Sequence, residues 1–399
     1  MQFRHYLPEQ SVTPFFQPWA LQLINHLNQK IYMNNVTLPA FSPEEFQRAR
    51  LFLATQVADM MGRKLEEGDW AKVYCAAKGI PLSGWSNTDI DIIYGPLGVE
   101  QKAMCRKANQ SIMEACGTRI MHPAGTRSIR FPQGEEDATK AAHNVLRQYG
   151  QLIANRTALV DAINRYHHGL LTREQAIAAL QAGIENMSKA SAEKRIPRQP
   201  ISSNQSIQKP DMRFGWLLWQ DSLREFLYFE EPMTAPDPSR YIGDWNERKA
   251  SGSRKATRNL WIFDKETGEK HFSITTEAGV KIQPYFRVPA SNDPNLYHFI
   301  VQGEDIGNGM VRVWLSQTTA NLLRQALGSL DPQEIAKAID AVKREEKAKE
   351  KSGDVFDPLA VEVLVPAPAY ARLKATFEGV SDEHNFKQLI EILQSSAST

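Results

Sequence analysis

Cysteine is scarce in this chain, with three residues among 399. Cys75, Cys105 and Cys116 form no Cys-x-x-Cys pair and no Cys/His spacing typical of a zinc site. An odd and sparse set of cysteines argues against a disulfide framework, and it favours reduced thiols in a cytosol. The sequence therefore excludes a small disulfide-built secreted protein.

Long apolar runs are also missing. The N-terminus, Met1 to His5, lacks the apolar region of a signal peptide, and no run approaches the roughly 20 residues that cross a bilayer. We therefore expect a soluble cytoplasmic protein without a membrane partner.

The chain has no excess of one charge, since 47 Lys and Arg residues stand against 46 Asp and Glu residues, for a net charge of +1. This balance does not exclude a nucleic-acid partner, because local clusters of Lys and Arg contact phosphates. Three chemical motifs are absent: a Gly-x-Ser-x-Gly nucleophile elbow, a Gly-rich loop ending in Lys-Ser/Thr, and histidines at metal-ligand spacing.

The chain is long enough for two domains. Its hydrophobic content of 42% can form a large core. We predict a first domain over residues 1–235, with a linker or loop at about 190–210, and a β-rich region with a charged helix over 236–399. Buried strands over 213–219 and 225–229 are expected to return to the sheet of the first domain.

Helices alternate with strands in the first domain. Ser42 and Glu45 form a capping pattern before an amphipathic run that Gly62 ends, and Asp137 precedes a longer run with one apolar stripe. Strand, helix and strand in this order predict an α/β core with a central mixed sheet flanked by helices. Helices are predicted over 43–61, 68–78, 105–116, 138–167 and 172–187.

A hairpin with charged side chains is the most informative feature. Gly95-Pro96 joins two apolar segments, residues 89–94 and 97–104. Because alternate residues of a strand share a face, Glu100 and Lys102 project together, as do Asp89 and Asp91. The hairpin therefore predicts a cluster of carboxylates and an ammonium on a sheet.

Metal-assisted hydrolysis of a phosphodiester is the chemistry that suits this cluster. Carboxylates bind Mg²⁺ through one or two side chains and leave the remaining positions to water and phosphate. The ion activates an attacking water, and a nearby Lys offsets the negative charge that develops on the phosphate. The alternative interpretation is a solvated strand face on which charges alternate by chance.

With this pattern the chain resembles the PD-(D/E)XK nuclease superfamily, and within it the type II restriction endonucleases. The residues that carry the resemblance are Asp91, Glu100 and Lys102. It implies a restriction-endonuclease-like core over about 60–160, with Asp91 and Glu100 as metal ligands and Lys102 as a catalytic cation. An acidic helix residue joins the cluster in that superfamily, which implies Glu67 or Glu66 here. The superfamily's Pro before the first Asp is absent, and whether Asp89 or Asp91 binds metal stays open.

Two basic clusters are candidate DNA contacts. Arg119, Arg127 and Arg130 follow the hairpin and suit bidentate contact with phosphate, although ion pairs with Glu135, Glu136 and Asp137 are an equal alternative. The second cluster surrounds a small-residue loop and includes Arg254, Lys255 and Arg258.

These features predict a Mg²⁺-dependent endodeoxyribonuclease that cuts double-stranded DNA at a specific sequence. The resemblance also implies a homodimer, because a two-fold enzyme can cut both strands of a symmetric site. Two alternatives remain: a non-catalytic DNA-binding protein on a nuclease-like scaffold, and a structure-selective repair nuclease.

Overall fold

The computed structural model of this chain describes most of the residues that follow Val36. The described ranges are 37–60, 62–82, 90–107, 111–122, 129–130, 134–184, 187–200, 207–248, 257–275, 281–327, 359–376 and 380–396.

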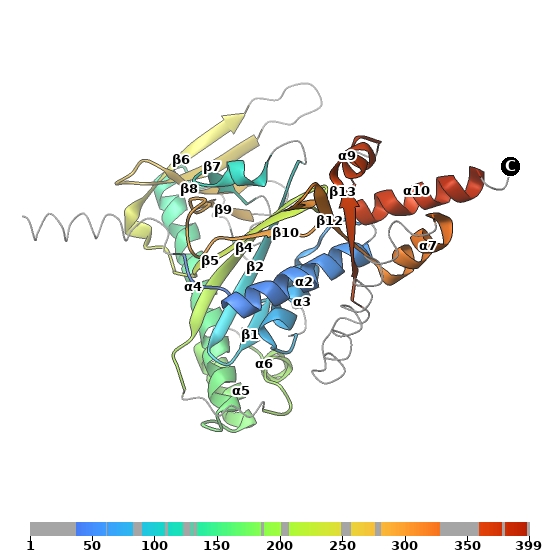
Figure 1. Cartoon of the computed structure of the whole chain (residues 1–399). Coiled ribbons are helices and arrows are strands. Elements are labelled where there is room, and N and C mark those ends of the chain that lie inside the picture. Colours follow the sequence, from blue (N-terminus) through green and yellow to red (C-terminus); the bar gives the residue numbers. More distant parts are fainter. Residues whose placement is uncertain are drawn as a thin grey trace, which may run out of the picture. The chain divides into compact units, whose positions relative to one another are not determined.

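The core is α/β, as predicted, and is built on a mixed five-stranded sheet (Figure 1). The strand order is β1-β2-β4-β5-β10, in which β2 pairs in parallel with β4 while the other neighbours are antiparallel. The parallel pair requires a crossover, and the chain between β2 and β4 supplies it with three helices. The bounds are β1 Ile92–Tyr94, β2 Leu97–Arg106, β4 Asp211–Gln220, β5 Glu225–Pro232 and β10 Tyr297–Ile300.

Helices cover both faces of this sheet. On one face, α2 (Pro43–Met60) and α3 (Glu67–Lys78) pack with Val99 and Tyr228 into an aromatic-rich core. On the other face, α4 (Ala138–His167) packs through a stripe that includes Val145. The central strands are therefore buried on both sides, which explains their nearly continuous apolar sequence.

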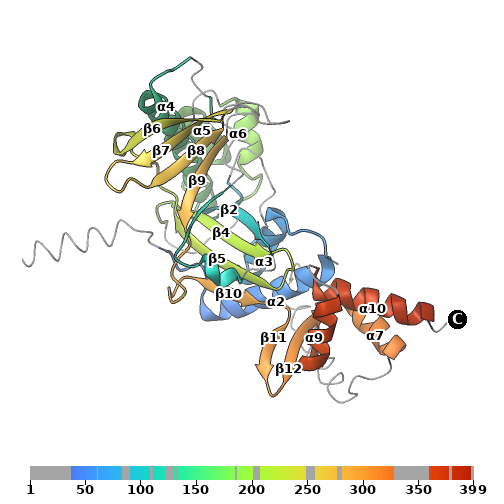
Figure 2. The same cartoon turned by 90° about the horizontal axis from the view of Figure 1, so that it is seen from above.

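A second five-stranded sheet has the order β3-β9-β8-β7-β6, with all neighbouring strands antiparallel. Figure 2 shows β6 to β9 with α4 behind them, so α4 lies between the two sheets and packs on each of them. The bounds are β3 Arg119–Met121, β6 Tyr241–Arg248, β7 Thr257–Asp264, β8 Lys270–Thr275 and β9 Lys281–Arg287.

The C-terminal part forms a smaller core. Three antiparallel strands, β11 (Glu304–Gly307), β12 (Met310–Leu315) and β13 (Val361–Pro366), pack with three helices. These helices are α7 Gln317–Leu327, α9 Ala367–Thr376 and α10 Asp382–Ser396. A buried ion pair fixes this core to the β4–β5 turn, because Arg224 Nη2 lies 2.8 Å from Asp382 Oδ1.

The local start and stop signals are confirmed. Glu45 accepts a hydrogen bond from Ser42 N at 2.8 Å in the capping box of α2, and Asp137 caps α4. Gly79 ends α3 with a φ of 64°, a left-handed conformation that suits glycine. The turn after β7 lies at Glu266–Gly268, and Asp264 Oδ1 accepts a hydrogen bond from Glu266 N.

The predicted helix over 105–116 is wrong. Strand β2 continues to Arg106, because its parallel pairing with β4 extends as far as Gln220. A 3₁₀ turn over Ile112–Ala115 is the only helical part described in this range. Two further helices lie between α4 and β4: α5 Arg173–Gly183, which ends earlier than predicted, and α6 Lys189–Arg195.

Contacts group residues 37–399 into one compact unit. The boundary predicted near 236 falls between β5 and β6, and β10, which follows it, belongs to the central sheet. The predicted linker range begins within α6. No helix among the described residues is long and apolar enough to cross a membrane.

Candidate active site

The predicted hairpin exists and positions the charged residues. Ile92 lies opposite Val99 and Tyr94 opposite Leu97, with Gly95 at a φ of 55° in the turn. One position beyond this pairing, Asp91 stands beside Glu100. The side chain of Asp91 is fixed there, because its Oδ2 accepts a hydrogen bond of 2.7 Å from Gln101 N.

Glu100 and Lys102 point to the face of the sheet that α4 covers. Gly98 precedes them with the same orientation, since a Cβ added to it would meet Val160 of α4 at 2.8 Å. Lys102 Nζ and Arg156 Nη2 each lie 3.0 Å from the same oxygen, Glu100 Oε1. Two cations therefore hold one carboxylate oxygen between the sheet and α4.

The other oxygen of Glu100 is in a different situation. Glu100 Oε2 is buried and has no hydrogen-bond partner among the described residues. A buried carboxylate oxygen without a hydrogen-bond donor destabilises the folded state, because it has lost its hydrogen bonds to water and gained none within the protein. This atom is a natural ligand for a cation.

Asp91 has an unusual protonation equilibrium. Burial, and next the negative charge of Glu100, raise the pKa of Asp91 to about 7, although Lys102 and the Gln101 amide oppose this change. Glu67, at the start of α3, raises it further. A bound cation would relieve the repulsion that the charge of Glu100 exerts on ionised Asp91.

Lys102 remains protonated at neutral pH. Burial alone would lower its pKa, but the negative charges of Glu100, Glu67 and Asp91 outweigh burial and raise the pKa of Lys102. A permanently charged ammonium serves to orient and stabilise anions, and it does not accept protons.

The residues present fit a Mg²⁺ ion that takes only a few of its ligands from the protein. No group of three or more His, Cys, Asp and Glu side chains in the described ranges could hold a metal ion. Mg²⁺ is commonly bound through one or two carboxylates with waters and phosphate in the other positions. Asp91 and the unpartnered Oε2 of Glu100 supply two such ligands.

Sequence reasoning missed two residues of this site. Arg156 lies on the apolar stripe of α4 between Ile153 and Val160, and a charged residue at a core position was the available signal. The second is Glu231. In the register of the sheet, Phe214 of β4 lies opposite Glu100 on one side and opposite Glu231 on the other, so the two glutamates stand in one row across the strands. Burial raises the pKa of Glu231 to about 7, while its Oε1 accepts from Trp216 Nε1 at 2.8 Å.

The predicted DNA-binding arginines are separated in the structure. Arg119 forms an ion pair with Glu269, which lies between β7 and β8, and not with the acidic residues near 136. Arg130 is exposed on a loop beside α4. Arg258 pairs with Glu247 at 3.3 Å and with Glu136 at 3.1 Å. Asp89, Arg127, Arg254, Lys255 and the charged helix predicted over 331–351 lie outside the described residues.

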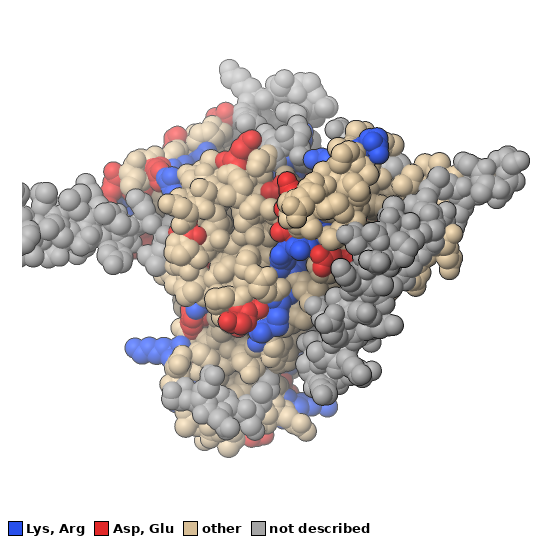
Figure 3. All heavy atoms as spheres, in the orientation of Figure 1, with Lys and Arg blue, Asp and Glu red and all other residues tan. Residues whose placement is uncertain are grey.

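Cations and carboxylates are mixed on the visible surface. Figure 3 shows Lys and Arg beside Asp and Glu over the described part, without a large area of one sign.

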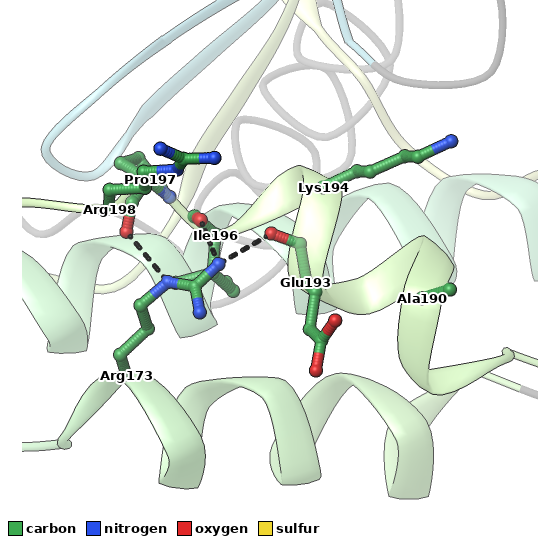
Figure 4. A pocket seen from close by; sticks show the side chains of 7 residues that line it. All are labelled: Arg173, Ala190, Glu193, Lys194, Ile196, Pro197 and Arg198. Carbon is green, nitrogen blue, oxygen red and sulfur yellow. Dashed lines mark hydrogen bonds between the residues drawn. The ribbon is translucent and has the colours of Figure 1, made fainter.

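An open pocket lies at α5 and α6. It contains Arg173, whose Nη2 donates a hydrogen bond to Glu193 O at 2.7 Å (Figure 4). This guanidinium joins the two helices, and the residues that line the pocket are Arg173, Ala190, Glu193, Lys194, Ile196, Pro197 and Arg198.

No protein-family model matches this chain, and no curated protein or solved structure matches it significantly.

Proposed function

We propose that this protein is a Mg²⁺-dependent endodeoxyribonuclease of the type II restriction kind, as its resemblance to the PD-(D/E)XK nucleases implies. The observation that carries the proposal is the Asp91–Glu100–Lys102 group. It combines a carboxylate of raised pKa, a buried carboxylate oxygen without a donor, and a charged ammonium 3.0 Å from the same glutamate.

Asp91 and Glu100 would hold the ion, which when bound lowers the pKa of an attacking water and neutralises charge on the phosphate. Lys102 orients that water and offsets the negative charge of the transition state. Arg156 fixes Glu100 by its Oε1, so that Oε2 keeps its direction. Glu67 adds negative charge beside Asp91 as an auxiliary acid.

Several features of the substrate complex belong to the same proposal. Double-stranded DNA would be held by Arg119, Arg127, Arg130, Arg254, Lys255 and Arg258. A homodimer would present two such sites to a symmetric sequence. The three free thiols, Cys75, Cys105 and Cys116, are compatible with a cytoplasmic location.

Digestion of a sequenced plasmid tests the proposal. Purified full-length protein with Mg²⁺ is expected to give discrete fragments with identical ends, and Ca²⁺ in place of Mg²⁺ is expected to give none. Asp91→Asn is the matched inactive variant. Folded protein that cuts no DNA in Mg²⁺ or Mn²⁺, yet binds it, would overturn the proposal in favour of a non-catalytic scaffold.

A structure-selective DNA nuclease is the second candidate. One observation favours it: aromatic side chains, including Trp261 and Tyr285, lie on the side of the second sheet that faces away from α4. Branched and flapped substrates in the same digestion separate the two candidates, because a restriction enzyme cuts intact duplex whereas a structure-selective enzyme requires the branch.

A further inference from the structure

The second sheet has one face turned to α4 and one turned away. Leu260, Ile262, Phe272, Ile274 and Ile282 form a core with α4. Because side chains alternate along a strand, the intervening residues project to the other side, which we call the outer face. The outer face includes Ile242, Asp244, Asn246, Asn259, Trp261, Phe263, Lys270, Ser273, Thr275, Lys281, Gln283, Tyr285 and Arg287 of β6 to β9, with Arg119 and Met121 of β3.

Aromatic rings stand at the centre of the outer face. Trp261 and Phe263 are in edge contact, with their ring centroids 6.4 Å apart. Lys270 Nζ lies 3.8 Å from the centroid of Trp261 and 5.0 Å from that of Tyr285. The ammonium therefore covers one face of the Trp261 ring in the unbound protein, and a base that stacks on this face displaces Lys270 toward a phosphate.

The charge of the outer face is positive. Its cations are Lys270, Lys281, Arg119 and Arg287, and the acidic residues near them are Asp244 and Glu269. Glu269 is shared between the two arginines. Lys270 and Lys281 form no ion pair with any described residue, so their charge is available to an anionic partner.

Polar side chains complete the pattern. One row across the sheet reads Asn246, Asn259, Thr275 and Lys281, and the next reads Asp244, Trp261, Ser273 and Gln283. Amides and hydroxyls such as those of Asn246, Asn259 and Thr275 hydrogen-bond to base edges and sugars, whereas Ser273 is buried between its neighbours. Among the described helices, α4 is the one whose residues pack with the apolar side chains of this sheet, and it does so on the face opposite the outer face.

We propose that the outer face binds single-stranded DNA, with bases stacked on Trp261 and Tyr285 and phosphates near Lys270 and Lys281. Stacking on side chains requires unpaired bases, because bases of a duplex already stack on one another. Excess positive charge complements the phosphate backbone, whereas an apolar protein partner would leave these lysines desolvated and unpaired. The inference goes beyond the proposed nuclease activity, since binding at this face needs neither the acidic cluster nor a metal ion.

Fluorescence anisotropy with a labelled 20-base oligothymidine in EDTA tests this inference. The full-length protein is expected to bind the single strand, and an unlabelled duplex of equal length should displace that strand less effectively than unlabelled oligothymidine does. Trp261→Ala combined with Tyr285→Ala should weaken binding by at least ~30-fold, from the loss of two stacking platforms. Lys270→Gln combined with Lys281→Gln should reduce the slope of log affinity against log salt by about 1.4.

Matched variants separate the surface from the stability of the sheet. Phe272→Leu alters an aromatic of the inner face, and Lys189→Gln with Lys194→Gln removes two exposed lysines of α6. Both are expected to bind like the parent. The inference is overturned if the outer-face variants also bind like the parent, if duplex is preferred, or if the control variants lose as much affinity. Intact binding without cleavage in Mg²⁺ would overturn the proposed nuclease function alone.

Discussion

Two adjacent rows of the central sheet carry buried glutamates on opposite faces, and they differ in how the carboxylates are satisfied. In the row Gln101–Gly215–Glu230, both oxygens of Glu230 are used: Tyr228 donates to Oε1 at 2.7 Å and Arg213 to Oε2 at 2.8 Å. In the row Glu100–Phe214–Glu231, two cations share one oxygen of Glu100 and the other has no partner among the described residues.

The carboxylate of Glu230 is closed, because both of its oxygens are paired, and that of Glu100 is open. In the first row it is the amide oxygen of Gln101, Oε1, that lacks a partner among the described residues. Gly215 permits the closed network, because a Cβ there would lie 2.4 Å from the hydroxyl of Tyr228 and 2.5 Å from Gln101 Oε1. Burial of an acid therefore does not identify a functional residue by itself. The unsatisfied carboxylate oxygen and the raised pKa of the neighbouring Asp91 do distinguish Glu100 from Glu230.

Asp91→Asn gives the largest expected effect on catalysis. The variant removes a metal ligand, so single-turnover cleavage should fall by at least ~1000-fold, or about 4 kcal/mol of transition-state stabilisation. Its melting temperature without divalent cations should not fall, because the neutral amide no longer repels Glu100 and still accepts from Gln101 N. Cleavage within threefold of the parent would remove Asp91 from the site.

Lys102→Met should have the next largest effect. It keeps the side-chain stem but removes the ammonium, so cleavage should slow by about 100-fold, or about 3 kcal/mol. Affinity for one cognate duplex in Ca²⁺ should change by no more than a few fold. A variant that binds poorly yet cuts normally at saturating DNA would make Lys102 a phosphate contact.

Glu230→Gln tests the fully paired carboxylate through its effect on the free energy of unfolding. Removing its charge breaks the buried ion pair with Arg213, which keeps its pair with the more exposed Asp211, and the free energy of unfolding should fall by about 2 kcal/mol. Cleavage per folded molecule should remain that of the parent. Glu225→Gln is the control on the same strand, because its half-buried pair with His298 is expected to contribute under about 1 kcal/mol. Equal losses in both variants would contradict the comparison.

Glu231→Gln should change the pH dependence of stability, because the amide does not titrate. The folded-state pKa of about 7 lies above the ordinary 4.5, so between these values the folded protein holds a proton that the unfolded chain has released. The free energy of unfolding of the parent therefore falls as pH rises through this window. Denaturant unfolding from pH 4 to 8 without divalent cations should give the variant a shallower decline, and identical slopes would show that Glu231 ionises normally.

The sequence by itself determined the elements whose signals are local. Ser42 with Glu45, Asp137 and Gly79 mark helix ends through hydrogen bonds within a few residues. Alternation in the hairpin likewise required Glu100 and Lys102 to share a face, because the period of a strand is fixed by its backbone. The α/β fold class followed from the order of such elements.

Tertiary structure alone decided which groups meet. Residues 105 and 106 became strand because β4, more than a hundred positions later, pairs with them. Arg156 joined Glu100 from α4, and Glu231 joined its row from β5, through contacts that no local pattern specifies. Whether a buried carboxylate is satisfied depends on donors brought by distant elements, so the difference between Glu230 and Glu100 exists only in the folded protein.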